Sequence, residues 1–219
     1  MDITSIDVIK ITATILALIV ATVGHEIMHG KVAHSYGDST AFNAGRLSIN
    51  PIKHLDIVGS IILPLILIVL SSPFVFGWAK PVPIHIKTIL RNGGYGGAIF
   101  VSLAGVIFNI FTAILASTIL ATMQEPNNLS DAFVYYFLFQ LVVINVVLAV
   151  FNMWPLPKFD GGNFLVYFSL MLGTDKILNL YMKLAPFTLV ILLIILFTPL
   201  QEILFSPAFW IWEKLLLQQ

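Results

Sequence analysis

Long runs of apolar residues, separated by polar loops rich in turn-forming residues, dominate this sequence. A membrane-spanning helix needs about 20 predominantly apolar residues. Four stretches meet that requirement: about 6–33, 96–122, 132–152 and 180–200. The pattern predicts an all-α polytopic membrane protein, a bundle of about five to six transmembrane or re-entrant helices that forms a single domain over residues 1–219.

A fifth apolar stretch, 57–77, is less regular than the other four. Pro64 lies inside it, and Ser71-Ser72-Pro73 interrupts it. Proline lacks a backbone donor and breaks or kinks a helix. Two interpretations are therefore open for 57–77: a kinked span, or a re-entrant segment that leaves the membrane on the side from which it entered.

The distribution of basic residues favours the re-entrant interpretation of 57–77. In that topology, the loops 34–56, 78–95 and 153–179 share one side, which carries nine of the eleven Lys and Arg side chains. A spanning 57–77 would divide them about seven to four. Because basic loops are enriched on the cytoplasmic side, we expect the more asymmetric arrangement, with these loops in the cytoplasm.

Composition narrows the chemistry that the chain can perform. Hydrophobic residues make up 58% and charged residues 10%, whereas soluble domains are about 25% charged. The formal net charge is zero, so nothing indicates a nucleic-acid partner. The chain has no cysteine, which excludes disulfides and thiolate ligands. Any metal must be held by nitrogen and oxygen atoms.

The first apolar stretch contains the motif His25-Glu26-Ile27-Met28-His29. Helix positions four apart lie on one face, so His25 and His29 can bind a single ion. Glu26 lies about 100° further around the helix, from where it can reach a metal-bound water. This is the H-E-x-x-H arrangement of two zinc ligands and a general base. Burying these groups without a metal would cost several kcal/mol, which favours metal binding over a purely structural polar cluster.

Catalytic zinc usually has three protein ligands and one water, and Asp160 is a candidate for the third ligand. It follows a long apolar run and two prolines, Pro155 and Pro157, so the backbone beside it is not regular helix. An ordinary helix-capping role for Asp160 is equally compatible with its position. By contrast, three histidines in polar loops are interpreted as surface residues: His34, His54 and His85.

Topology links the two candidate sites. If 57–77 is re-entrant, spans 6–33 and 132–152 run parallel, and their C-terminal ends meet on one side of the membrane. His29 and Asp160 can then converge. If 57–77 crosses the membrane, Asp160 emerges on the opposite face.

Together the motifs resemble those of the site-2 protease family of intramembrane zinc metalloproteases. H-E-x-x-H runs from His25 to His29, and N-x-x-P-x-P-x-x-D-G runs from Asn152 to Gly161. Between them, Gly105 to Asn109 is similar to the family's G-P-x-x-N, with Val106 where proline is usual. The resemblance covers about residues 20–170, and it is closest to the small branch of the family that has no PDZ or regulatory domain.

The resemblance implies a catalytic core over about residues 6–172, built on three helices, and a C-terminal transmembrane helix at about 177–205. It implies one zinc ion held by His25, His29 and Asp160, with Glu26 activating the water. Asn152 is implied near the zinc, where its amide would orient the substrate carbonyl or the oxyanion. The expected substrate is a transmembrane protein in the lipid bilayer, cleaved in a bacterial plasma membrane by a site that opens towards the cytoplasm.

Two other classes of protein use similar residues. Membrane desaturases carry H-x-x-x-H boxes, but they need roughly eight or more histidines for two irons, and this chain has five. A metal-binding transporter or scaffold would use the same ligands without needing Glu26 as a base. The sequence leaves the substrate and the oligomeric state open. It also suggests that residues 78–84 pair with an unwound substrate by strand addition.

Overall fold

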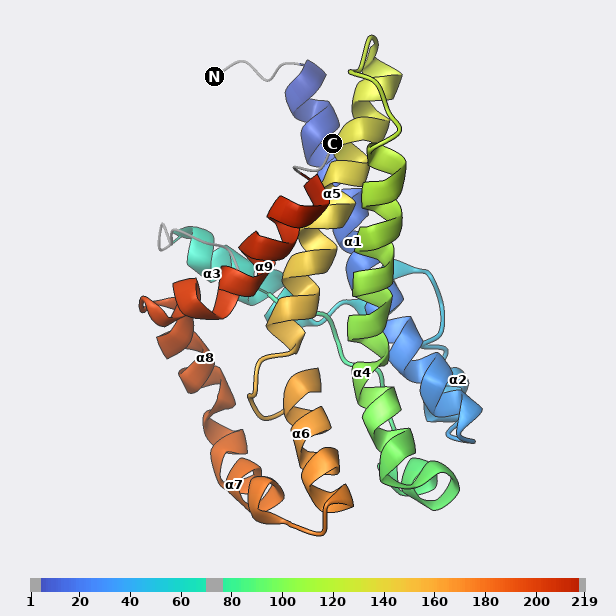
Figure 1. Cartoon of the computed structure of the whole chain (residues 1–219), viewed down its shortest axis with the longest axis vertical. Helices are drawn as coiled ribbons and strands as arrows, with labels where there is room; N and C mark the ends of the chain where they lie inside the picture. The colour runs from blue at the N-terminus through green and yellow to red at the C-terminus, as the bar shows by residue number, and fades with distance from the viewer. Residues whose placement is uncertain (1–4, 70–76, 217–219) are drawn as a thin grey trace.

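The computed structural model describes residues 5–69 and 77–216, and this part of the chain contains helices and loops but no β-strand. Figure 1 shows the arrangement. The elements are α1 (Ser5–Ser35), α2 (Thr40–Asn43), η1 (Pro51–His54), η2 (Ile57–Ile62), α3 (Leu63–Val69), α4 (Ile86–Leu120), α5 (Leu129–Asn152), α6 (Asp160–Met171), α7 (Lys176–Leu184), η3 (Ala185–Phe187), α8 (Thr188–Leu196) and α9 (Leu200–Leu216).

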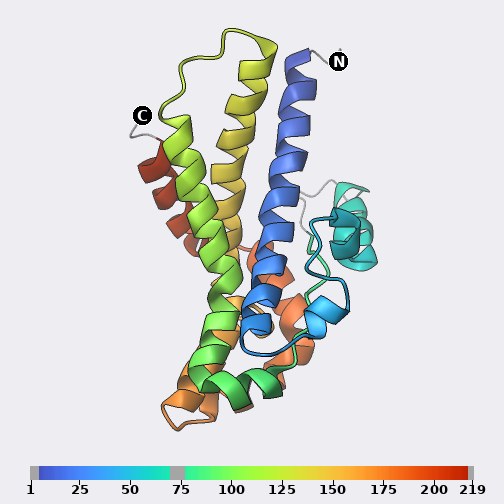
Figure 2. The same ribbon diagram turned by 90° about the vertical axis from the view of Figure 1, so that its right-hand side faces the viewer.

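Three long helices, α1, α4 and α5, pack against one another and form the centre of the molecule. Figures 1 and 2 show that α1 and α5 run in the same direction and α4 in the opposite one. On α1, Ala13, Ala17 and Ala21 are fully buried at intervals of four residues. Small residues on one face let neighbouring helices approach closely where hydrophobic burial does not drive their association. The predicted all-α bundle is confirmed.

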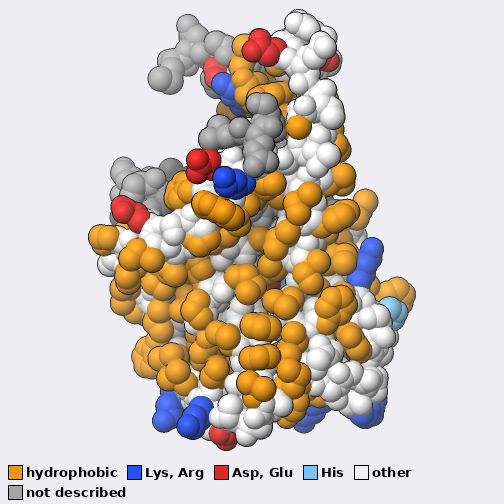
Figure 3. Space-filling view, viewed as in Figure 1, with side chains coloured by type: hydrophobic (Ala, Val, Ile, Leu, Met, Phe, Trp, Pro, Cys, Tyr) orange, Lys and Arg blue, Asp and Glu red, His pale blue; other side chains and the backbone are white. Residues whose placement is uncertain are grey.

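The surface of the bundle is that of a membrane protein. Four stretches in the described part of the chain are long and apolar enough to cross a bilayer: α1, α4, α5 and the combined run Lys176–Leu196. Hydrophobic side chains cover the middle of the face in Figure 3, and Lys and Arg side chains gather at its lower end. The prediction of a polytopic membrane protein agrees with both observations.

The two ends of the irregular segment 57–77 lie next to each other. The Trp78 N–H donates to the Gly59 carbonyl at 3.2 Å, and the Ser60 hydroxyl donates to the Trp78 carbonyl at 2.9 Å. The segment begins as a π-helix, η2, and continues as α3. Residues 70–76 lie outside the described part of the chain. Trp78 thus lies next to Gly59, near the point where the segment begins. This return agrees with the re-entrant interpretation.

The C-terminal stretch, expected as one helix at about 177–205, is divided in the structure. Helix α8 ends at Leu196, and α9 begins at Leu200. Pro199 explains the division, because a proline disfavours helical geometry in the residue before it. Beyond the break, α9 packs on the core, where the Trp212 indole donates to the Val143 carbonyl at 3.2 Å.

Candidate metal centre

His25 and His29 project from one face of α1, as their spacing predicts. Their rings are in contact, with centroids 4.7 Å apart, and their Nε2 atoms are 3.1 Å apart. Both residues are buried, with exposed fractions of 6% and 7%. Helical geometry alone therefore directs the two imidazole nitrogens to a common point.

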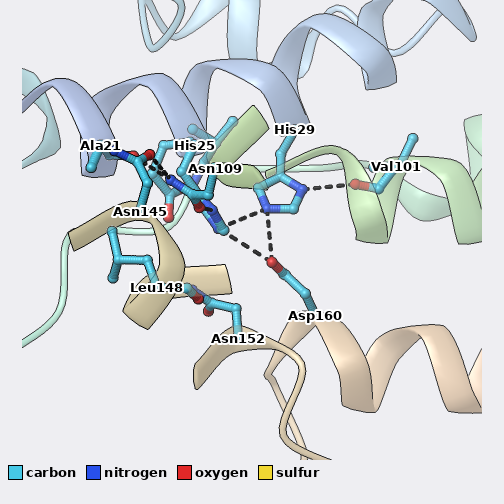
Figure 4. Close-up of polar contacts among 11 residues, drawn as sticks. Ala21, His25, His29, Val101, Asn109, Asn145, Leu148, Asn152 and Asp160 are labelled. Carbon is cyan, nitrogen blue, oxygen red and sulfur yellow. Dashed lines mark hydrogen bonds and ion pairs between the residues drawn. The ribbon is translucent and has the colours of Figure 1, made fainter. Parts of the chain in front are cut away.

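Asp160, the first residue of α6, reaches the same point from the opposite side (Figure 4). Its Oδ2 atom lies 3.2 Å from His25 Nε2 and 3.3 Å from His29 Nε2. The sequence left Asp160 undecided between ligand and helix cap. The structure brings it together with both histidines, in a group of three side chains that could hold a metal ion.

The loop between α5 and α6 is tightly folded, which sets the position of Asp160. Lys158 has a left-handed backbone with φ of 71°, a conformation that side chains other than glycine rarely adopt. A Cβ on Gly161 would lie 2.2 Å from the Met153 carbonyl oxygen, and one on Gly162 would lie 1.9 Å from that of Leu156. Two glycines must therefore follow Asp160 for the loop to pack against the start of α6.

Each imidazole is oriented through its second nitrogen. His25 Nδ1 lies 2.6 Å from Asn109 Oδ1, and His29 Nδ1 lies 2.7 Å from the Val101 carbonyl oxygen. Both partners are acceptors, so each Nδ1 carries the hydrogen and each Nε2 presents a lone pair. Metal-bound histidines are typically held in this way.

The orientation of the Asn109 amide is itself determined by its neighbours. Its Nδ2 donates to the Ala21 carbonyl at 3.2 Å and to Asn145 Oδ1 at 2.7 Å, which places Oδ1 towards His25. Asn145 donates in turn to the Leu141 carbonyl at 2.8 Å. Asn109 and Asn145 are fully buried. This chain of amides connects α5, α4 and α1 to the first histidine.

The three converging atoms fit a zinc ion. The two Nε2 atoms and Asp160 Oδ2 lie 3.1–3.3 Å from one another. Because neither Nε2 carries a hydrogen in this tautomer, no hydrogen bond joins these three atoms. Asp160 Oδ2 is buried and has no hydrogen-bond donor among the described residues. Tetrahedral zinc with ligand distances of about 2.0–2.1 Å separates neighbouring ligand atoms by about 3.3 Å. The donor set and its spacing therefore suit zinc.

Gly105 on α4 makes this close packing possible. A Cβ at Gly105 would lie 2.5 Å from His25 Cε1 and 2.5 Å from His29 Nε2. The backbone of α4 thus lies directly against both imidazole rings. This is a physical reason for the glycine in the Gly105 to Asn109 motif.

Glu26 is separate from the three converging groups. Its Oε2 accepts a hydrogen bond from the Val82 N–H at 2.8 Å. Glu26 nevertheless lines the same cavity as His25, His29 and Asp160, a space of about 1360 Å³. The carboxylate therefore shares a cavity with the three candidate ligands.

Asn152, the last residue of α5, also lines this cavity. One hydrogen of its amide group is donated to the Leu148 carbonyl at 2.9 Å (Figure 4). An amide NH₂ has two hydrogens, so the second remains for another acceptor. Asn152 thus lies near the three candidate ligands, and its side-chain hydrogen bond goes to the Leu148 carbonyl.

The interpretation of His54 as a surface residue is wrong. Its side chain is 2% exposed, lines the cavity and donates from Nε2 to the Ser48 carbonyl at 2.8 Å. His34 and His85 are exposed, as expected. Asn145 was not among the predicted site residues. Its polar side chain in the middle of an apolar span was a usable signal, because such residues are rare inside membranes.

Replacing Asn145 with leucine is expected to lower zinc affinity by about 10-fold, since substitutions of groups that orient metal ligands typically cost 10–100-fold. The change removes the acceptor that holds the Asn109 amide, which then orients His25 less firmly. Zinc competition against a chelator measures the effect. Ser117→Ala is the matched control, because Ser117 is a buried polar residue on α4 that bonds to the Leu215 carbonyl. Equal affinities for the two variants would contradict the orienting role of the amide chain.

Two known proteins are similar to this chain. A Bacillus subtilis protein with the name "Putative zinc metalloprotease YwhC" is 36% identical over 151 residues, which cover 67% of this chain and 64% of that protein. A Mycolicibacterium smegmatis protein with the name "Putative zinc metalloprotease Rip2" is 28% identical over 137 residues, 63% of this chain and 49% of that protein. The chain thus spans less than two thirds of either relative. No protein-family model and no solved structure matches it.

Proposed function

We propose that this chain belongs to the same family as the two proteins named zinc metalloproteases and that it is an intramembrane zinc endopeptidase. The observation that carries the proposal is the convergence of His25, His29 and Asp160 on one point, in a cavity between membrane-spanning helices that Glu26 also lines. Ionisable groups at membrane depth are costly and mark functional sites. A metal-dependent hydrolase explains all four residues together.

In the proposed reaction, His25, His29 and Asp160 would hold one zinc ion, which when bound would acidify a water molecule and polarise the scissile carbonyl. Glu26 takes one proton from the attacking water, whose oxygen forms the new bond to the carbonyl carbon. Glu26 then delivers that proton to the amine as the C–N bond breaks. The free hydrogen of the Asn152 amide is available to the developing oxyanion.

The proposed substrate is a transmembrane segment of another membrane protein. A helix hides its carbonyl groups in internal hydrogen bonds, so the segment must unwind before it can be cut. Trp78, Ala79, Pro81, Val82 and Ile84 line the same cavity as the ligands, and this extended stretch is suited to pairing with an opened chain. We place the cavity entrance on the cytoplasmic side, where the basic loops lie.

Removing the metal is expected to abolish cleavage, and restoring zinc is expected to recover it. The test uses the purified chain in liposomes with a transmembrane test substrate, treated with a chelator and then with stoichiometric zinc. Magnesium serves as the control cation, because it prefers six oxygen ligands and does not suit a site of two imidazoles and one carboxylate. Cleavage that persists after all zinc has been removed would contradict the proposed function.

A further inference from the structure

The extended stretch from Trp78 to Val82 is held to the rest of the protein at every second residue. The N–H groups of Trp78 and Lys80 donate to the carbonyls of Gly59 and His54, at 3.2 and 2.8 Å. The Val82 N–H donates to the Glu26 carboxylate at 2.8 Å. Of these three donors, Val82 is therefore the one that ends on a side chain, and that side chain is the proposed general base.

Carbonyl groups on the same edge are held as well. The Ser60 hydroxyl donates to the Trp78 carbonyl at 2.9 Å, and Arg46 Nη2 donates to the Lys80 carbonyl at 2.6 Å. Arg46 is buried, with 7% of its surface exposed. A buried guanidinium and a run of backbone hydrogen bonds thus fix the position of the stretch before it reaches Val82.

The residues on either side of Val82 make its N–H a well-defined donor. Pro81 and Pro83 have fixed φ angles and no N–H. Each also favours extended geometry in the residue before it, which is Lys80 for Pro81 and Val82 for Pro83. Across residues 81–83, Val82 is consequently the one residue that can donate a backbone hydrogen bond, and it is 6% exposed.

Glu26 needs such a partner. The terminal torsion of a glutamate side chain is broad and roughly two-fold, so the helix backbone alone does not set the plane of the carboxylate. A hydrogen bond from Val82 to Oε2 defines that plane and leaves Oε1 to take up the proton of the water. A backbone donor can do this without a charge that would compete for the carboxylate.

We propose that Val82 is a positioning residue whose backbone N–H orients the Glu26 carboxylate as the general base. The rigid Lys80-Pro81-Val82-Pro83 stretch keeps this N–H in one position. The inference rests on the proposed function, because it assigns Glu26 a proton to take. It also gives residues 78–84 a second role beside substrate pairing. Because Val82 is hydrogen-bonded to Glu26, a displacement of this stretch would also displace the Glu26 carboxylate.

The kinetic test compares Val82→Pro with Val82→Ala. Proline removes the N–H and suits the extended backbone, whereas alanine removes most of the side chain and keeps the N–H. We expect kcat of Val82→Pro to be at least about 10-fold below that of Val82→Ala, with equal zinc content and similar KM. Equal kcat values in two folded, zinc-loaded variants would overturn the proposal.

A second measurement does not depend on cleavage. The Val82 amide, labelled with ¹⁵N and followed by NMR in detergent without metal, is expected to exchange its hydrogen slowly in the parent. Glu26→Ala removes the acceptor and should speed that exchange at least about 10-fold, while the Lys80 amide stays protected as an internal control. Unchanged protection of Val82 in Glu26→Ala overturns the proposal even if the parent is an active protease. Loss of Val82 protection in Glu26→Ala, combined with a parent that is protected at Val82 but cleaves nothing, would retain the contact and reject the proposed function.

Discussion

Glu26→Gln is expected to abolish cleavage of a transmembrane substrate and to leave zinc bound. The amide has nearly the same shape as the carboxylate, and its carbonyl oxygen can still accept the hydrogen bond from Val82. It cannot take a proton from water. Loss of a general base typically lowers the rate by about 10²–10⁴-fold, and none of the three metal ligands is altered. The measurement is cleavage in liposomes, with zinc content determined for parent and variant.

The outcomes of this experiment separate the function classes that share these ligands. Cleavage by the parent but not by Glu26→Gln, at equal zinc content, is the expected result for a metalloprotease. Cleavage that survives in the variant contradicts the role of Glu26. Zinc in both proteins with cleavage in neither would favour a metal-binding membrane protein without catalytic activity, for which Glu26 has no chemical task.

Gly105→Ala is expected to eliminate zinc binding, with an affinity loss of at least about 100-fold, at the upper end of what changes around metal ligands cost. The added Cβ would lie 2.5 Å from atoms of both His25 and His29. Neither ring can move aside freely, because Asn109 and the Val101 carbonyl hold their Nδ1 atoms. The rings must leave the metal position, or α4 must move away from α1.

Gly96→Ala is the matched control for this substitution. Gly96 lies on the same helix, and a Cβ there meets nothing within 4 Å. In a helix interior alanine favours the helix over glycine by about 1 kcal/mol, so helix propensity would stabilise Gly105→Ala and cannot explain a loss of zinc binding. Zinc affinity is measured by chelator competition, and the melting temperature checks folding. Normal zinc binding by Gly105→Ala would show that the two helices are not packed as described.

Much of this protein was predictable because the relevant signals are local. In a bilayer, each backbone polar group must be paired within the chain, so long apolar stretches become helices. The α-helical period places residues four apart on one face, which brought His25 and His29 together without reference to any other element. The basic loops favoured a re-entrant 57–77, and that topology in turn predicted parallel α1 and α5.

Other features depended on contacts between distant segments. A local pattern cannot distinguish a ligand from a helix cap at Asp160, because both roles suit an acidic residue at the start of a helix. The predicted C-terminal helix ignored the effect of Pro199, which divides it. His54 occupies a polar loop, yet it is buried, since other parts of the chain fold over it.

The sequence by itself determined the membrane class, the helices of the core and the pair of histidines, because hydropathy and helical period act over neighbouring residues. Only the tertiary structure decided which partners complete the site. Asp160, the Asn109 and Asn145 amides and the Val82 N–H come from other parts of the chain. Their approach to α1 depends on close helix packing at Gly105 and on the loop that Gly161 and Gly162 allow. The spacing of residues within one segment cannot predict contacts between segments that are distant in the sequence.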